Sequence, residues 1–181
     1  GQQRTGSALW SGDVEGTWES LRAQIPGGLS VGMCGLPYWN TDIGGFFLHG
    51  FQDALHDPAY HELYVRWMQF GCFTPMMRSH GTHAPRELHL YGKPGEPLFE
   101  ALRRPITLRY ALLPYLYAMM RDVHTRGASM MRPLLADYPD DPRVRDLGSE
   151  FLFGPSLLVA PVLRSMHLCG GALDFDRVGR H

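Results

Sequence analysis

The sequence has little of what marks several large classes of protein. Its longest apolar run, residues 111–120, is interrupted by Pro114, whereas a membrane-spanning helix needs about 20 apolar residues. Only 19% of the 181 residues are charged and the formal net charge is −1. This balance provides no electrostatic footprint for nucleic acid or an anionic membrane surface, so neither is expected as a partner.

Cysteine is also scarce. Cys34, Cys72 and Cys169 are widely spaced and form no C-x-x-C pair. This odd, sparse count argues against a disulfide framework, and we expect three small buried side chains. The chain opens at Gly1 with no initiator Met and no basic or apolar leader. We therefore expect that a signal was removed or that the true start lies upstream, and the compartment stays undetermined.

Glycine, proline and apolar residues are abundant. There are 21 Gly and 14 Pro, against an average for both of about 12% of residues. The 44% hydrophobic and 12% aromatic content excludes a disordered chain. The length allows one domain with a real core, but it falls short of the ~250 residues of a typical (β/α)₈ barrel.

Three short apolar segments are predicted to be strands, each followed by a loop and then a helix. They are residues 6–10, 29–34 and 72–77. Such alternation favours a parallel sheet. Functional side chains in parallel α/β folds lie in the loops after the carboxyl ends of the strands. We therefore expect Asp13, Asp42 and His80 to share one edge of the sheet.

Caps and breakers mark the helices between these strands. The predicted helices run from Thr17 to Pro26-Gly27-Gly28, from Asp57 to Gly71 and from Leu98 to Val123. Thr17 and Asp57 are typical N-caps, and Pro58 suits the first helical position. Pro105 and Pro114 are expected to bend or break the third helix.

The pattern changes after Gly127. Residues 130–136, 150–153 and 156–162 read as short strands separated by turn signals. Consecutive strands without helices predict a second, all-β unit. The expected division is 1–127, 128–163 and an atypical tail, 164–181, in which no coherent period is visible.

Asp13 has two interpretations. It follows Trp10-Ser11-Gly12 at a strand end, which suits a carboxylic acid for proton transfer beside an indole that excludes water. The alternative is an Asx turn or a cap for the next helix, the commoner use of such a residue.

Asp42 lies in an aromatic, Gly-rich loop, residues 37–46. Aromatic faces stack on sugar rings and a carboxylate accepts hydrogen bonds from hydroxyl groups, so the composition suits a sugar site. A packed loop that uses its aromatic side chains as a plug explains the composition equally well. Arg78 is expected to pair with Asp42 or Glu87.

His80, His83 and His89 suggest zinc by their spacing. The strong zinc patterns add a helix-borne Glu or paired cysteines, and neither is present. A metal site is therefore not expected, although a metal-dependent α/β enzyme remains the alternative from another class.

Many co-linear segments resemble the catalytic barrel of glycoside hydrolase family 31. The most specific are Trp10-Ser11-Gly12-Asp13, Thr41-Asp42-Ile43-Gly44-Gly45-Phe46, Arg66-Trp67-Met68-Gln69-Phe70-Gly71, Arg78-Ser79-His80-Gly81 and Met131-Arg132-Pro133-Leu134. Residues 153–162 resemble the start of the sandwich that follows this barrel. The resemblance covers residues 1–162 and implies an α/β fold, the C-terminal part of a (β/α)₈ TIM barrel followed by the start of an all-β sandwich domain.

The resemblance implies a retaining α-glycoside hydrolase that works through two aspartates. It assigns the acid/base role to Asp13, substrate contacts to Asp42 and His80, and pocket walls to Trp10 and Phe46. It implies an oligosaccharide or α-glycoside substrate and no metal or organic cofactor. Residues 11–14 and 25–29 look more like bacterial α-xylosidases than like the animal maltases.

The chain departs from the family pattern at its start. The family's nucleophile lies in a Trp-x-Asp-Met-Asn-Glu segment, which this sequence does not contain, and an arginine of the sugar site is also missing. We therefore expect a fragment that is inactive alone. An α-glucosidase of the same family and a non-catalytic sugar-binding or degenerate protein remain the alternatives.

Overall fold

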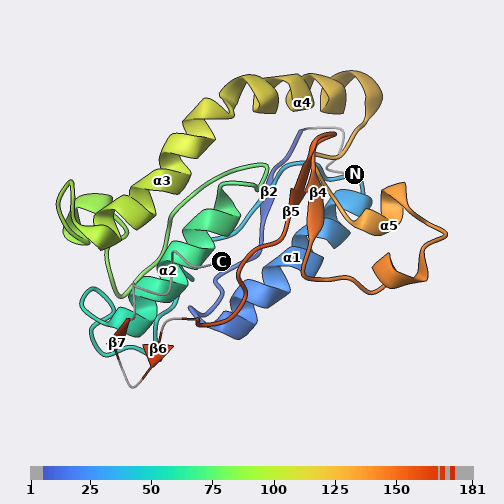
Figure 1. Ribbon diagram of the computed structural model, residues 1–181. Coiled ribbons are helices and arrows are strands. Elements are labelled where there is room, and N and C mark those ends of the chain that lie inside the picture. Colours follow the sequence, from blue (N-terminus) through green and yellow to red (C-terminus); the bar gives the residue numbers. More distant parts are fainter. Residues whose placement is uncertain (1–5, 167, 170–171, 174–181) are drawn as a thin grey trace.

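The computed structural model describes residues 6–166, 168–169 and 172–173. Helices alternate with very short strands in the first two thirds, and strands dominate afterwards (Figure 1). In order the elements are β1 Leu9–Trp10, α1 Trp18–Met33, β2 Trp39–Asn40, α2 Pro58–Gly71, the 3₁₀ helix Leu88–Leu90, α3 Pro97–Ala111, α4 Leu113–Arg126, β3 Met131–Arg132, α5 Leu134–Asp137, the 3₁₀ helix Pro142–Val144, β4 Phe151–Phe153, β5 Leu157–Val159, β6 Leu168–Cys169 and β7 Ala172–Leu173. Within these ranges no helix has the length and apolar character needed to cross a membrane.

Three neighbouring backbone segments run parallel. β1 pairs with β2 through Leu9 with Trp39 and Trp10 with Asn40, so the strand expected in residues 6–10 is confirmed. Residues 76–79 run along the outer side of β2. There Met76 N donates to Trp39 O (3.2 Å), Ile43 N donates to Arg78 O (3.2 Å), and Ile43 bridges Ser79 in parallel. The expected parallel arrangement is therefore present, with strands of minimal length.

The strand predicted at residues 29–34 is wrong, because α1 continues through Pro26-Gly27-Gly28 to Met33. Leu21, Ile25 and Leu29 form one buried helical face. Gly28 lies against the indole of Trp39, and a Cβ there would come within 2.8 Å of the ring. This long-range packing outweighs the local breakers, and the strand forms ten residues later at β2.

Residues 72–77 were predicted as a strand and instead form a turn. Thr74 Oγ1 donates to Gly71 O (2.8 Å) and lies 2.9 Å from Met76 O. The Arg109 guanidinium of α3 donates to three carbonyls of this turn, those of Cys72, Thr74 and Pro75, at 2.7 to 2.9 Å. Carbonyls bound in this way are not available to a strand ladder, so parallel pairing begins only at Met76.

The other helix predictions are confirmed. Thr17 and Asp57 cap α1 and α2, accepting from Ser20 N and Ala59 N. Pro114 starts a new helix, so the long pattern splits into α3 and α4, which Figure 1 shows as a bent rod. Pro105 does not break α3, because it is buried on the face that packs against α2.

The core centres on α2, which contributes four of the largest fully buried side chains: Tyr60, Tyr64, Trp67 and Phe70. Burial raises the pKa of the Tyr64 hydroxyl to about 12. Phe70 packs edge-on against Phe151 of β4 with ring centroids 6.0 Å apart. The helical part and the following sheet therefore share one core.

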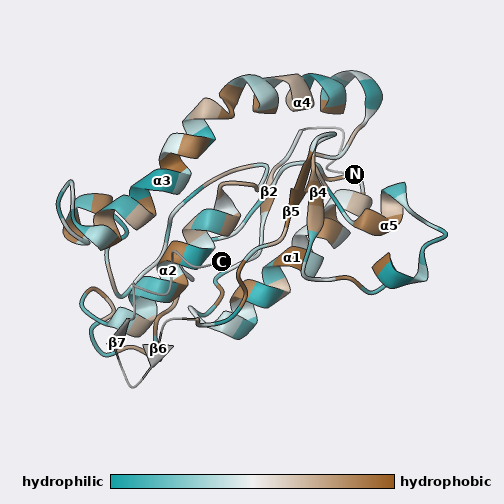
Figure 2. Cartoon of the chain, in the orientation of Figure 1, coloured by the Kyte–Doolittle hydropathy of each residue, from teal (hydrophilic) through white to brown (hydrophobic). Residues whose placement is uncertain are grey.

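The second unit is a three-stranded antiparallel sheet in the order β3-β4-β5. β4 and β5 fall within the predicted strand segments 150–153 and 156–162, and Figure 2 shows the hydrophobic colour along both. Residues 134–137 form α5 and not a strand. The start of the predicted tail contacts the core, since Ser165 Oγ and Met166 N donate to the buried Glu62 carboxylate at 2.6 and 2.8 Å.

The cysteine prediction is partly wrong. Cys72 is buried, and this burial raises the pKa of its thiol to about 11. Cys34 is exposed at the end of α1. Its exposure follows from the extension of α1, which places residue 34 at a helix terminus and not within a buried strand. The side chain of Cys169 lies outside the described residues.

Gly154 lies where α4 meets the sheet. Its φ is +63°, and a Cβ there would collide with Met119 Sδ and Tyr115 Oη of α4. Tyr115 Oη itself donates to Phe153 O (2.9 Å) and accepts from Ser156 N (3.1 Å). The turn between β4 and β5 thus packs directly on α4, and only glycine leaves room for that contact.

We predict that Gly154→Ala lowers the free energy of unfolding by about 2–4 kcal/mol, because it adds left-handed strain and overpacking. Urea unfolding followed by circular dichroism measures this. Gly148→Ala is the matched control, since no atom lies within 4 Å of its added Cβ. Equal effects of the two variants would contradict the argument.

Candidate active site

The three predicted polar side chains follow three adjacent parallel segments. Asp13 comes after β1, Asp42 after β2 and His80 after residues 76–79. Because these segments are paired in parallel, their carboxyl ends meet at one edge. The structure therefore brings these residues to the same edge, as the order of elements predicted.

Asp42 is the most buried of the three, with a relative exposure of 0%. Its Oδ1 accepts from Arg78 Nη2, which confirms one of the two expected partners. Its Oδ2 is buried and has no hydrogen-bond partner among the described residues. A buried carboxylate oxygen left unpaired costs free energy, so a hydrogen bond donated to this atom would be stabilising.

Asn40 determines how Arg78 approaches Asp42. With its amide oriented to satisfy its neighbours, the Asn40 nitrogen donates to Leu9 O (3.3 Å) and its oxygen accepts from Arg78 Nε (3.2 Å). The buried amide therefore connects all three parallel segments.

Asp13 is exposed, and its carboxylate makes no hydrogen bond to any residue that the structure describes. The backbone turns sharply there, since Gly12 has a φ of +81° and Val14 N donates to Gly12 O (2.9 Å). Asp13 does not cap α1, because Thr17 does. The cap interpretation is thus wrong, and the carboxyl group is accessible for proton exchange.

The remaining predicted residues surround this edge. Phe46 is half-buried, and its ring centroid lies 5.5 Å from that of the exposed His80. Trp10, at the end of β1, is 53% exposed.

Two neighbouring groups have roles that sequence reasoning missed. Arg86 Nη2 donates to Gly45 O (2.7 Å) and its guanidinium lies 5.5 Å from the Tyr60 ring centroid, so it holds the Gly44-Gly45 turn. His83 Nδ1 accepts from Leu48 N (3.1 Å). Neither contact has a local sequence signal, because each partner lies 35 or more residues away.

Among the described residues, no group of three or more His, Cys, Asp and Glu side chains is placed to hold a metal ion. His83 Nδ1 accepts a hydrogen bond from the backbone amide of Leu48, so this nitrogen is not available to a metal. The zinc alternative therefore finds no ligand set in the part of the chain that is described.

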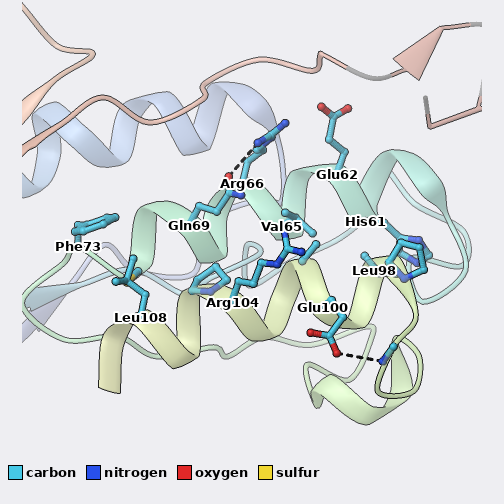
Figure 3. A pocket seen from close by; sticks show the side chains of 15 residues that line it. His61, Glu62, Val65, Arg66, Gln69, Phe73, Leu98, Glu100, Arg104 and Leu108 are labelled. Carbon is cyan, nitrogen blue, oxygen red and sulfur yellow. Dashed lines mark hydrogen bonds between the residues drawn. The ribbon is translucent and has the colours of Figure 1, made fainter. Parts of the chain in front are cut away.

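A cavity of about 700 Å³ lies between α2 and α3 (Figure 3). Its lining combines apolar side chains such as Val65, Leu98 and Leu108 with the charged Glu100 and Arg104. None of the predicted site residues lines it, so the candidate site is the open edge at the strand ends and not this cavity.

The parallel β/α units, with carboxylates at the strand ends, define part of an α/β barrel of the kind that carries its active site at this edge. Comparison with known families is consistent with that assignment. The glycosyl hydrolases family 31 TIM-barrel domain matches residues 1–119, and the glycosyl hydrolase family 31 C-terminal domain matches residues 127–170. The chain belongs to glycosyl hydrolase family 31.

The chain is also similar to individual alpha-xylosidases and to an alpha-glucosidase. The chain is 43% identical over 162 residues to an alpha-xylosidase of Saccharolobus solfataricus, covering 90% of this chain and 21% of that protein. It is 38% identical to the lysosomal alpha-glucosidase of Mus musculus, over 85% and 15% of the two chains. A crystal structure of the alpha-xylosidase from Xanthomonas citri superposes with a TM-score of 0.82 at 44% identity, over 87% and 17%. The chain thus spans between 15% and 21% of the length of these relatives.

We predict that Arg78→Met lowers the free energy of unfolding by about 2 kcal/mol, because it leaves the Asp42 carboxylate buried without its cation. Because the Arg78 side chain is 45% exposed, this loss of stability is smaller than for a fully buried ion pair. Asp42→Asn in the same background should restore part of the loss. A double-mutant cycle in urea measures the coupling, and strictly additive effects would contradict it.

Proposed function

We propose that this chain is the acid/base part of a retaining α-glycoside hydrolase with α-xylosidase-like specificity. The reaction is hydrolysis of terminal α-linked sugar residues by double displacement. The observation that carries the proposal is the open edge itself, where an exposed Asp13 and a buried Asp42 with one unpaired oxygen follow adjacent parallel strands.

Asp13 acts as the general acid/base. It first protonates the leaving glycosidic oxygen and then, as a carboxylate, takes a proton from the water that attacks the glycosyl intermediate. Asp13 is exposed, and none of the described residues donates a hydrogen bond to its carboxylate, which supports this role.

Asp42 and His80 bind hydroxyl groups of the sugar that is cleaved, and Phe46 and Trp10 form walls of its pocket. Asp42 is suited to this role because Arg78 holds one carboxylate oxygen and leaves the other buried and unpaired. The contact between the Phe46 and His80 rings places an apolar face beside a polar one, as sugar binding requires.

Double displacement needs a second carboxylate about 5–5.5 Å from the first. We infer that it comes from a Trp-x-Asp-Met-Asn-Glu segment outside this chain, and that the chain alone is inactive. We further propose a barrel part at 1–127, a sandwich start at 128–163 and an atypical tail at 164–181.

Xyloside specificity is favoured over glucoside specificity by the relatives. The identities to α-xylosidases reach 43–44%, against 38% for the mouse α-glucosidase. A further α-xylosidase structure, from a soil metagenome, is complexed with xylose and matches with a TM-score of 0.82. An α-glucosidase remains the alternative within the family.

We predict that Asp13→Ala, in the full-length enzyme that carries this chain, lowers kcat/KM by about 10²- to 10⁴-fold for glycosides with poor leaving groups. Activated aryl glycosides should lose far less, since they need little protonation. Steady-state kinetics on both substrate types measure the difference. Asp53→Ala, an exposed acid paired with His56, is the control, and equal losses on both substrates would refute the role of Asp13.

A non-catalytic sugar-binding protein is the second candidate, favoured by the unpaired Asp42 oxygen in a chain without the nucleophile segment. Calorimetry of the isolated chain with xylose or a small α-glycoside decides between the two. We expect no binding and no hydrolysis, because part of a barrel leaves strand edges unpaired and its core open. Millimolar or tighter binding would favour the second candidate.

A further inference from the structure

Beside the candidate site lies a cluster of rings that the proposed roles do not use. Phe47 and His49 stack with centroids 5.1 Å apart, His49 meets His83 edge-on at 4.8 Å, and Phe47 lies 5.9 Å from His83. The two His side chains are exposed. We call these three residues the Phe47–His49–His83 cluster.

The cluster continues directly from the candidate sugar site. Phe46, whose ring contacts His80, also packs edge-on against Phe47 with centroids 4.8 Å apart. An unbroken series of ring contacts therefore leads from His80 to His49 and His83.

The cluster is also fixed beside the segment that carries Asp13. Val14 O accepts from Phe46 N (2.7 Å) and Phe47 N (3.1 Å). The Glu15 carboxylate accepts from His49 N (2.7 Å) and contacts His49 Nδ1 (2.9 Å). Residues 46–49 thus run along residues 14–16, immediately after Asp13.

Residues 46–49 are held on their other side by the loop that follows residues 76–79. Thr82 N donates to Phe46 O (2.8 Å), and Leu48 N donates to His83 Nδ1 (3.1 Å). His83 keeps a φ of +68°, a conformation that a non-glycine residue maintains only where its surroundings fix it. Loops following all three parallel segments therefore converge on the cluster.

The ring nitrogens are oriented by these contacts. His83 Nδ1 accepts a backbone hydrogen bond, so the proton of the neutral ring is on Nε2. His49 Nδ1 lies 2.9 Å from a Glu15 carboxylate oxygen, which can only accept, so Nδ1 donates to it and Nε2 stays unpaired with Glu15. Ring nitrogens able to hydrogen-bond thus accompany the aromatic rings, the combination that binds a sugar ring by stacking and by its hydroxyl groups.

We propose that the Phe47–His49–His83 cluster binds the leaving group of the substrate, and that this leaving group is itself a sugar. The inference rests on the proposed function, because Asp13 protonates the oxygen that joins the cleaved sugar to the leaving group. Residues 46–49 adjoin residues 14–16, directly after Asp13, and are therefore positioned to contact the leaving group. The cluster thereby selects α-linked oligosaccharides over glycosides with small or flexible leaving groups.

The test uses the full-length enzyme that carries this chain and two substrates with the same cleaved sugar. An α-linked disaccharide places a ring at the cluster, whereas the α-glycosyl fluoride has no ring there. Phe47→Leu keeps apolar volume but removes the flat face, and it should lower the ratio of kcat/KM for disaccharide over fluoride about tenfold. Phe47→Tyr should preserve the ratio.

His49→Gln supplies an independent variant should Phe47→Leu fail to fold, and it should lower the same ratio. His56→Ala is the control, an exposed His of the same loop that pairs with Asp53 outside the cluster. Equal losses on both substrates, or an unchanged ratio, would overturn the proposal while leaving the proposed function intact. A wild-type enzyme that cleaves neither substrate would overturn the proposed function and this inference with it.

Discussion

The pairing of the buried Asp42 carboxylate with Arg78 is the interaction on which the candidate site depends. A carboxylate with no exposed surface is tolerated only where a cation and hydrogen bonds compensate its lost hydration. Arg78 supplies both, from the segment that follows β2 in space but lies 36 residues away in sequence. The pair therefore fixes the loop after β2 against the neighbouring parallel segment, residues 76–79.

Hydrogen bonds from arginine side chains replace part of the backbone pairing that holds sheets with longer strands together. β1 and β2 have two residues each, so few ladder hydrogen bonds hold the edge together. Arg109 instead binds three carbonyls of the turn before residue 76, and Arg86 binds Gly45 O. Charge-assisted hydrogen bonds are stronger than neutral ones, which compensates for the short pairing.

The same contacts explain which parts of the structure could be predicted from the sequence. Thr17, Asp57 and Pro114 act on their own helix ends, so their roles follow from local chemistry. The prediction that α1 ends at residues 26–28 was wrong because Trp39, a distant residue, packs on Gly28. The order of strands sufficed to bring Asp13, Asp42 and His80 to one edge, because parallel pairing determines that edge regardless of where each strand begins.

The finer geometry depends on an amide that no sequence pattern singles out. An arginine facing a carboxylate commonly donates through two nitrogens, which would occupy both carboxylate oxygens. Here Asn40 accepts from Arg78 Nε, so that nitrogen is not available to Asp42. Arg78 Nη2 then binds Oδ1 alone, and Oδ2 stays unpaired. The side chain that connects the three segments is thus also the one that leaves a carboxylate oxygen of Asp42 unpaired.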